Sequence, residues 1–495
     1  MNANRRQFLT GAAWLGLAVA AGKAVGGVKI PEVPGTMFGY ADADLAARIA
    51  KGQKLRVGVV GLGMRGRGAA RRLPFIPGLE VTAICDIREE QTTVISKWYA
   101  DNGYPVPQVF GHSEESYKAL CESDKVDLVY ICTPWAWHTK MACYAMEHGK
   151  HAATEVPSAM TVEECWQCVE TAERTRRHCM QLENCCYGEA ELATLNLVRQ
   201  GFYGELKYGE CGYIHDLRLN ITTPESGGSY QGEWRMKWNM AHKGDMYATH
   251  GLVPQMQWMN INRTEDRMDY LVSMEGAPLG FADFIRRHYP ADDPRQKLRF
   301  ESGDMNYTLI KTLKGRTILV EHDVQTERGY SRINRLHGAR GWSAGTHQID
   351  SCCFEDESGK PIKLSLTDEK GRKVDGARAW NRQYAHPFWR DFGNLGKKVG
   401  GHGGMDFLMD LRLAYCLQNG LALDQDVYDL ASSCCIAELS ERSVRNRSAS
   451  QDIPDFTRGA WKTAKPLGII NLDKSKLPGL SEDSIKSDKD ALEVS

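Results

Sequence analysis

The stretch Lys54-Leu-Arg-Val-Gly-Val-Val-Gly-Leu-Gly-Met-Arg-Gly66 decides the fold. Its first seven residues predict a compact β-strand, and Gly61-x-Gly63-x-x-Gly66 follows without a break. Residues 69–73 then predict the continuation into a helix. Glycines between a strand and a helix permit a tight turn and let the backbone approach a pyrophosphate, which sits at the helix N-terminus. The stretch therefore predicts a dinucleotide-binding unit.

The acidic residue expected of such a unit is Asp86, which ends the next apolar run, Leu79 to Cys85, 20 residues past Gly66. A carboxylate there accepts hydrogen bonds from a ribose 2′-hydroxyl and repels a 2′-phosphate, so NAD is favoured over NADP. Arg88 suits a phosphate and keeps NADP open as an alternative. A glycine-rich structural turn is the other interpretation, and the strand, helix and acidic residue together disfavour it.

Apolar runs alternate with helical segments over residues 54–185. Residues 126–132 and 151–154 predict further strands, 141–147 predicts a helix, and Thr161-Val162-Glu163-Glu164 is a capping box that opens another. Strands that alternate with helices imply right-handed crossovers and a parallel sheet. We therefore predict an α/β protein whose NAD-binding domain, residues 54–185, is a doubly wound Rossmann sheet.

The pattern changes beyond about residue 200. Segments with β-type composition are 205–214, 305–313, 316–324 and 331–337, with a hairpin turn at Lys314-Gly315. Helical segments return at 405–418 and 425–442, on either side of Gly420. We predict an α+β substrate domain with an open antiparallel sheet over residues 186–461, followed by an extended charged tail, 462–495.

The N-terminus carries Asn4-Arg5-Arg6-Gln7-Phe8-Leu9-Thr10 ahead of a mild apolar run, residues 12–21. Paired arginines before such a run predict a twin-arginine signal over residues 1–31, hence export to the periplasm or medium. A basic, fraying terminus is the alternative. Residues 32–53 predict a linker or arm.

Composition excludes several classes of protein. With 62 Lys+Arg against 63 Asp+Glu, a net charge of -1 gives no reason to expect nucleic acid as partner. No window reaches the roughly 18 apolar residues of a membrane span. The fifteen cysteines include three adjacent pairs, which predict buried reduced thiols, and Cys165-x-x-Cys168 lacks a second pair of metal ligands. We expect no metal.

Two strand ends carry polar and aromatic residues. Thr133-Pro134-Trp135-Ala136-Trp137-His138 follows the third predicted strand, and Glu155 follows the fourth. The carboxyl ends of strands form the ligand crevice of a doubly wound sheet, so this loop and Glu155 are expected to converge there. A plug of the core is the alternative for the two tryptophans.

The glycine fingerprint, the Thr-Pro-x-x-x-His loop, Gly149-Lys150-His151 and Glu155-x-Pro157 resemble the glucose-fructose oxidoreductase and inositol dehydrogenase family. Its members join a Rossmann domain to a domain built on an open antiparallel sheet. The family's usual Glu-Lys-Pro carries a catalytic lysine where this chain has Val156, and its Asp-x-x-x-His is replaced by Tyr247-Ala248-Thr249-His250. Both departures remove acid–base groups that a simple sugar dehydrogenase uses.

Those departures resemble the branch called glycoside hydrolase family 109, on the evidence of Trp-x-Trp-His, Glu-Val-Pro, Glu183-Asn184, Tyr213 and Tyr-x-Thr-His. The resemblance implies an α-N-acetylgalactosaminidase that keeps NAD as a non-consumed cofactor. It implies NAD contacts, beside Gly61, Gly63 and Gly66, from Met64, Arg65, Asp86, Trp135, Ala136, Trp137, His138, Glu155, Val156 and Asn184. It implies sugar contacts from Tyr213, Arg235, Tyr247, Ala248, Thr249, His250 and Tyr330.

The implied chemistry is self-consistent. Oxidation of the sugar C3 hydroxyl acidifies the C2 proton, the aglycone leaves by elimination, water adds, and hydride returns to C3, with no net redox. We expect His250 to act as base for the C3 hydroxyl, Tyr213 and Tyr247 to trade protons, and Glu155 to assist or hold the sugar. The expected substrate is a glycan ending in N-acetylgalactosamine, and we expect a homo-oligomer.

Two rival functions remain open: an NAD-linked sugar dehydrogenase, and a non-catalytic NAD-bound sugar-binding protein. Single residues also have purely structural interpretations. His250 and Tyr213 are each compatible with packing alone, and Arg235 with stacking between Trp234 and Trp238. His402, in Gly400-Gly401-His402-Gly403-Gly404, lies in a flexible loop that would close on a ligand.

Overall fold

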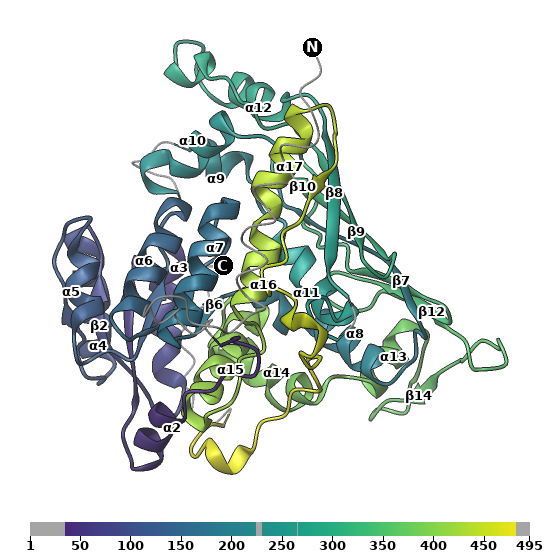
Figure 1. The fold of residues 1–495 in the computed structure, drawn as a ribbon, viewed down its shortest axis with the longest axis horizontal. Coiled ribbons are helices and arrows are strands. Elements are labelled where there is room, and N and C mark those ends of the chain that lie inside the picture. The colour runs from purple at the N-terminus through teal and green to yellow at the C-terminus, as the bar shows by residue number, and fades with distance from the viewer. Residues whose placement is uncertain (1–34, 224–229, 265, 482–495) are drawn as a thin grey trace, which may run out of the picture. The chain divides into compact units, whose positions relative to one another are not determined.

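The computed structural model describes residues 35–223, 230–264 and 266–481 (Figure 1). The expected export signal and the last residues of the tail lie outside the described residues. The fold set out below is that of the compact unit that begins at Thr36. None of the described helices combines the length and the apolar character needed to cross a bilayer.

The first domain is built on a six-stranded parallel sheet, which confirms the predicted Rossmann architecture. Its strands, in spatial order, are β3 (Gln108–Val109), β2 (Leu79–Cys85), β1 (Leu55–Val60), β4 (Leu128–Ile131), β5 (His151–Thr154) and β6 (Cys179–Gln181). β4 and β5 are buried along their whole length, because helices cover both faces of the sheet.

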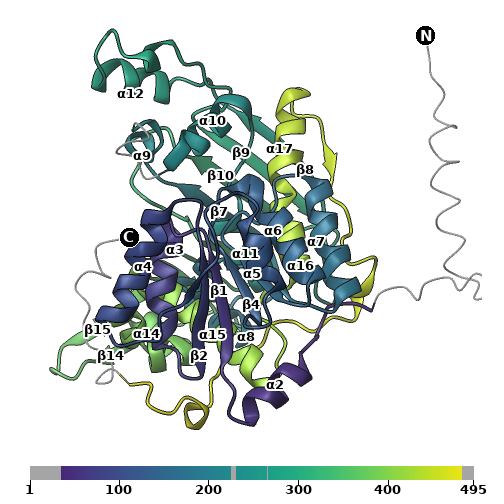
Figure 2. The same cartoon turned by 90° about the vertical axis from the view of Figure 1, so that its left-hand side faces the viewer.

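Five helices form the crossovers: α3 (Met64–Arg72), α4 (Glu89–Asp101), α5 (Ser116–Glu122), α6 (Trp135–Glu147) and α7 (Val162–Thr175). Figure 2 shows α3 and α4 on one side of the parallel strands and α6 and α7 on the other. The predicted capping box is present, since Thr161 accepts from the backbone of Glu164 at the start of α7. One prediction is wrong: residues 135–138 are not a loop but the first turn of α6, because Pro134 caps a helix that begins directly at the strand end.

The second domain holds an eight-stranded sheet in which one neighbouring pair, β7 and β10, is parallel and the other pairs are antiparallel. In spatial order its strands are β13 (Ser351–Phe354), β12 (Gly341–Ala344), β11 (Arg335–Gly338), β7 (Leu206–Ile214), β10 (Thr317–Asp323), β9 (Asn306–Thr312), β8 (Met268–Glu275) and β16 (Gln451–Asp452). The sheet is therefore mixed and mostly antiparallel. The hairpin turn between β9 and β10 contains Gly315, as expected.

Helices α8 (Glu189–Arg199), α11 (Thr249–Met259), α16 (Val427–Cys434) and α17 (Ile436–Arg445) lie between the two sheets, whereas none of the described helices covers the outer face of the eight-stranded sheet (Figure 1). The remaining elements are α9 (Arg218–Thr222), α10 (Trp234–Ala241), α12 (Gly280–His288), α13 (Ala377–Gln383), α14 (Pro387–Val399) and the β14 (Ser365–Thr367)–β15 (Lys373–Asp375) hairpin.

Helix α15 (Met405–Asn419) brings the C-terminal region back to the first domain. It is buried nearly all round, as a helix between two layers must be, and it contacts β1 and α2 (Ala43–Ala50). The segment expected as a linker thus contains a helix. Asp42 caps that helix and accepts from His151 and Arg177 of the first domain.

Part of the tail packs against the hydrophobic core. Where composition predicted an extended segment after residue 461, Ile470 and Leu477 are buried, because their apolar side chains contact the core.

All fifteen cysteines are free thiols, and eleven of them are buried. Burial is as expected for these eleven, whereas Cys353 is exposed.

Candidate active site

The glycine turn after β1 is shaped for close backbone approach. Gly61 has φ +84°, and a Cβ on it would lie 2.9 Å from the Cys132 carbonyl. A Cβ on Gly66 would lie 1.7 Å from the Gly61 oxygen, so no side chain fits there. Gly63, by contrast, is the N-cap residue of α3, and a Cβ on it would meet no atom within 4 Å. With no side chain at this position, nothing covers the start of the helix there. The first N–H groups of α3 are therefore available to a pyrophosphate, and Met64 beside them is exposed.

Asp86 lies at the end of β2, beside this turn. Its Oδ2 accepts from the Leu62 backbone N–H at 2.6 Å, and its Oδ1 accepts from the Arg88 N–H at 2.9 Å. These bonds fix the carboxylate at the strand end, where a ribose is expected. The Arg88 guanidinium lies 3.7 Å from the same carboxylate, so it neutralises Asp86 instead of standing free for a phosphate. Turn and carboxylate together fit a dinucleotide.

Arg65, on the first turn of α3, lies at the centre of a buried polar network. It donates to Glu155 at 2.9 Å and to Asp406 at 2.9 Å, and it lies 2.9 Å from His402 Nδ1. Asp406 Oδ1 accepts from Asn184 at 2.6 Å. Three residues implied as NAD contacts, Arg65, Glu155 and Asn184, are thus brought together by a carboxylate from α15.

Asp406 was missed by the sequence reasoning. Burial alone would raise the pKa of its carboxyl, but Arg65, His402 and Arg72 hold that pKa well below its usual range. It is therefore charged, and it neutralises cations of the first domain. The signal available was its place two residues after the glycine-rich loop that contains His402. In the structure His402 of that loop contacts Arg65 and Asp406, and closure on a ligand stays a prediction.

The four residues Trp135–His138 do not all face the ligand crevice in which they were expected to meet Glu155. Trp135 is buried and donates from Nε1 to the Val156 carbonyl at 3.2 Å. The two ring nitrogens of His138 lie 2.7 and 2.6 Å from the Pro157 and Thr133 carbonyl oxygens. His138 therefore links the segments that follow β4 and β5 and has a structural role. Ala136 is exposed. Trp137 packs away from the site, against Tyr117 and Lys140.

Aromatic side chains build the second part of the site. The Tyr213 and Tyr247 rings stack at 4.5 Å, and the Trp135 ring lies 5.8 Å from that of Tyr247. Arg235 from α10 places its guanidinium carbon 5.0 Å from the Tyr247 ring and 5.1 Å from the Trp135 ring. Arg235 is buried, its partners are tyrosines, and among the described residues no carboxylate pairs with it. Burial raises the pKa of Tyr213 and of Tyr247, so both phenols stay protonated.

Two further residues border this aromatic cluster. The Tyr330 ring lies 6.4 Å from that of Tyr213, and its hydroxyl accepts from Arg332 at 3.0 Å. The Tyr213 hydroxyl lies 2.9 Å from His215 Nδ1. Burial lowers the pKa of His215 to about 4, so its ring is neutral and can accept that bond. His215, the first residue after β7, was missed by the sequence analysis.

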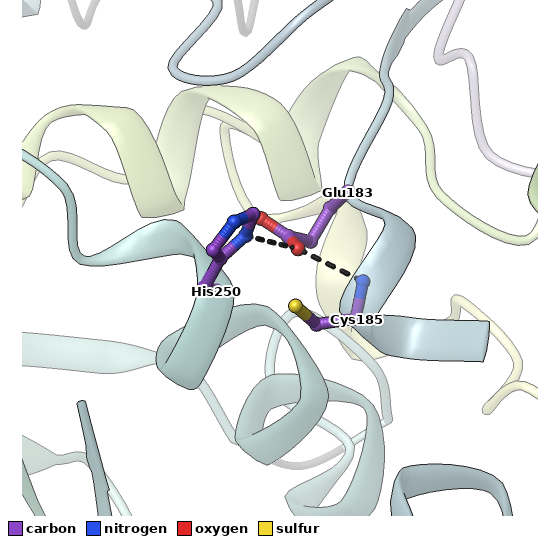
Figure 3. A group of neighbouring side chains, drawn as sticks. All are labelled: Glu183, Cys185 and His250. Atoms are coloured by element: carbon purple, nitrogen blue, oxygen red, sulfur yellow. Dashed lines mark hydrogen bonds and ion pairs between the residues drawn. The ribbon is translucent and has the colours of Figure 1, made fainter. Parts of the chain in front are cut away.

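His250 lies in the first turn of α11, after the buried residues Ala248 and Thr249. Its Nδ1 lies 2.7 Å from Oε1 of Glu183, which follows β6 (Figure 3). The backbone N–H of Cys185 donates to the same oxygen at 3.1 Å. The His250 ring centre is 4.9 Å from that of Tyr247. Sequence reasoning assigned Glu183 no chemical role.

Glu183, Cys185 and His250 also have the donor atoms of a zinc site, within 4.8 Å of one another. Two ligands on a tetrahedral zinc lie roughly 3.3 Å apart, given bonds of about 2.0 Å. The 2.7 Å between Glu183 Oε1 and His250 Nδ1 is shorter and is that of a charge-assisted hydrogen bond. Burial also raises the pKa of the Cys185 thiol well above its usual range. The group is a hydrogen-bonded pair with a neutral thiol beside it.

Two family models match the chain. The C-terminal domain of glycosyl hydrolase 109 matches residues 187–463, and the NAD-binding Rossmann fold of an oxidoreductase family matches residues 55–182. A family 109 protein of Shewanella pealeana is 43% identical over 472 residues, covering 95% of this chain and 100% of that protein. A protein of Shewanella oneidensis called alpha-N-acetylgalactosaminidase is 44% identical over 471 residues, 95% of this chain and 99% of its own length.

Among solved structures, levoglucosan dehydrogenase in complex with NADH and L-sorbose is 16% identical, with a TM-score of 0.59 over 81% of this chain and 99% of that one. An oxidoreductase domain protein from Kribbella flavida has a TM-score of 0.60 at 16% identity, over 81% of this chain and 100% of its own. These two share the fold.

Proposed function

The chain belongs to glycosyl hydrolase family 109, and from that premise we propose that it removes terminal α-linked N-acetylgalactosamine from glycans. It is a glycoside hydrolase with an NAD-binding Rossmann domain. The α-N-acetylgalactosaminidase of Shewanella oneidensis, 44% identical over nearly its whole length, supports the sugar assignment.

The observation that carries the mechanism is the state of two carboxylates in the site, Glu155 and Glu183. Conventional glycosidases need an acid and a nucleophile or base facing each other across the scissile bond. Here Glu155 pairs with Arg65 and Glu183 with His250, so each carboxylate already has a partner. We propose instead the route of oxidation at C3, elimination, addition of water and reduction.

In that route NAD, when bound, would supply reversible hydride transfer at C3 of the sugar, which leaves no net redox change. Gly61, Gly63, Gly66 and Asp86 would hold the dinucleotide, and Arg65 and Asn184 would border it. His250 takes the proton of the C3 hydroxyl. Glu155 would accept the C2 proton during elimination, while Tyr213 and Tyr247, whose pKa values burial raises, are protonated and would donate to the leaving oxygen and, on addition, to C2.

Hydrolysis of 4-nitrophenyl α-N-acetylgalactosaminide by purified protein, with no cofactor added, tests this function. We expect nitrophenol and free sugar in equal amounts, without accumulation of NADH. Because the acetamido group marks the substrate, the matching α-galactoside should react far more slowly. NADH formed in step with product would identify a sugar dehydrogenase. Absence of hydrolysis with NAD bound would identify a sugar-binding protein.

We also propose export by the twin-arginine route. Support comes from Arg5-Arg6 followed by Phe8-Leu9 and a weakly apolar run. Replacing both arginines by lysine should leave the protein inside cells that export the parent chain. Fractionation that finds the two equally exported would reject the route.

A further inference from the structure

We infer that Glu183 is the positioning residue of His250: it fixes the imidazole with its proton on Nδ1 and leaves Nε2 as the proton acceptor. The inference rests on the proposed function, in which His250 takes a proton from the sugar. Glu183 itself is buried behind His250 and acts through it.

The first step is the charge of Glu183. Burial opposes ionisation, but the His250 imidazole, its hydrogen bond and the Cys185 N–H outweigh burial and hold the pKa of Glu183 below its usual value. An ionised carboxylate accepts hydrogen bonds and donates none. His250 Nδ1, 2.7 Å from Oε1, must therefore carry the proton. In a neutral imidazole the other nitrogen, Nε2, then has the free lone pair.

The second step is the absence of a competing cation. Among the described residues, no lysine or arginine forms an ion pair with Glu183, and its close side-chain partner is the His250 ring. Glu191, also buried, is instead matched by Arg332. When His250 takes a proton from the sugar, the imidazolium that forms has the Glu183 carboxylate already in contact. A buried carboxylate favours that charged form.

The third step is rigidity. Glu183 caps the short helix η2 (Asn184–Tyr187), and its carbonyl accepts from Gln425 at 3.0 Å. The next residue, Asn184, donates to Asp406. The backbone is therefore held on both sides of the carboxylate. Glu183 and Asn184 also join the sugar side of the site, through His250, to the network that borders the dinucleotide, through Asp406.

Glu183→Gln tests the inference, because an amide is nearly isosteric but uncharged. Its NH₂ group can donate to Nδ1, which would move the proton to Nε2 and block the acceptor. We expect kcat to fall by about 10²–10⁴-fold, the usual contribution of a general base, with KM nearly unchanged. Glu183→Asp keeps the charge and should recover part of kcat. Glu173→Gln, which removes a buried carboxylate paired with Arg458 in another region, should retain kcat.

A second readout is independent of turnover. Nitrogen NMR of protein labelled in histidine reports which ring nitrogen carries the proton, and the His250→Asn variant identifies the His250 signals. We expect Nδ1–H in the parent protein and loss of that preference in Glu183→Gln. Dinucleotide released on denaturation should be equal in the two proteins, since Glu183 contacts no residue of the glycine turn.

The outcomes separate the two claims. Retention of kcat within threefold in Glu183→Gln, or an Nε2–H tautomer in the parent protein, overturns the positioning role. If the parent protein shows no hydrolysis, the proposed function fails, and the NMR result still decides whether Glu183 sets the tautomer. If Glu183→Gln does not fold, the parent tautomer and the Glu183→Asp kinetics decide.

Discussion

Arg65 donates from Nη1 to Asp406 Oδ2 at 2.9 Å, although the two residues are 341 positions apart. One belongs to the first turn after β1, and the other to helix α15 near the end of the chain. The same carboxylate accepts from Asn184. The C-terminal region therefore completes the cofactor side of the first domain.

Replacing Asp406 by Ala should weaken both stability and cofactor retention. The change leaves the partly buried Arg65 and the buried Arg72 without a charge that now lies 2.9 and 3.5 Å away. Breaking a buried pair costs about 3–5 kcal/mol, which should lower the melting temperature. Dinucleotide released on denaturation should also fall. Asp101→Ala breaks an exposed pair with Lys97 and serves as control. Full retention of dinucleotide in Asp406→Ala would contradict the role.

Two glycine variants should separate folding from cofactor binding. Ala at position 66 would place its Cβ 1.7 Å from the Gly61 oxygen, so the turn must distort and the protein should be destabilised. Ala at position 63 meets no atom within 4 Å, so the fold should persist, but its methyl would enter the space expected for the pyrophosphate. Thermal melts and dinucleotide content measure the two effects.

Gly468→Ala, a position with no neighbour within 4 Å, is the control. Asp86→Ala should resemble Gly63→Ala, with a folded chain that retains less NAD. If Gly63→Ala and Asp86→Ala both carried the parent's dinucleotide content, the assignment of the turn to the cofactor would be wrong.

Arg235 should matter more to hydrolysis than to folding. A buried guanidinium with no carboxylate among the described residues is unfavourable in the free protein. We therefore expect Arg235→Met to leave the melting temperature unchanged or higher. Hydrogen bonds from a charged group contribute about 1.5–3 kcal/mol, so kcat/KM should fall by roughly 10–150-fold. Loss of stability with full kcat/KM would assign Arg235 to packing alone.

His322, paired in register with Tyr213, should make stability depend on pH. Burial, with a smaller effect of Arg235, lowers its pKa to about 3, whereas an unfolded histidine titrates near about 6.5. The unfolded chain thus binds the extra proton between those values. The contribution of His322 to the free energy of unfolding is complete above a pH of about 6.5. It is lost as the pH falls toward about 3, at about 1.4 kcal/mol per pH unit.

Urea unfolding at pH 7 and pH 5 measures this loss, and His322→Gln should lose less stability over that interval. His148→Gln, at a partly exposed position, should behave like the parent. Equal losses in parent and His322→Gln would show that other groups carry the acid sensitivity.

The sequence predicted β1, β2, β4 and β5 of the first domain because their evidence is local, but it did not predict β3 and β6, which are only two and three residues long. Each buried parallel strand is an apolar run, and Asp86 follows the glycine turn at the expected spacing. The parallel pairing of β7 with β10 was not predictable. The end of β7 and the start of β10 are separated by 102 residues, and local sequence patterns carry no information on which strands pair. Hence the second sheet was predicted antiparallel and is mixed.

The candidate site divides in the same way. Tyr213, Tyr247 and His250 came from motifs, and the structure brings them together. His138 came from the same reasoning and instead binds two backbone carbonyls, which no motif reveals. Glu183 and Asp406 gain their roles from partners 67 and 222 or more residues away, so only the folded chain identifies them.

The proposed elimination should exchange the hydrogen at C2 of the sugar. Removing the C2 proton and later replacing it opens that carbon to solvent, whereas displacement at C1 never touches it. Hydrolysis in heavy water should therefore place deuterium at C2 of the released N-acetylgalactosamine, as mass spectrometry and proton NMR can show. His250→Ala is the control: because it should not start the oxidation, substrate incubated with it in heavy water should gain no deuterium at C2.

His250→Ala should also reduce kcat by about 10²–10⁴-fold, because it removes the base that starts the oxidation, and Tyr247→Phe should slow the proton transfers around it. Substrate deuterated at C3 should react more slowly wherever hydride removal limits the rate. Because a shielded base that returns the same hydrogen would leave no exchange, substrate deuterated at C2 should also be tested for a slower reaction, which is expected wherever cleavage of the C2–H bond limits the rate. Product that keeps all of its C2 deuterium, together with full activity of His250→Ala, would exclude elimination and point to direct displacement.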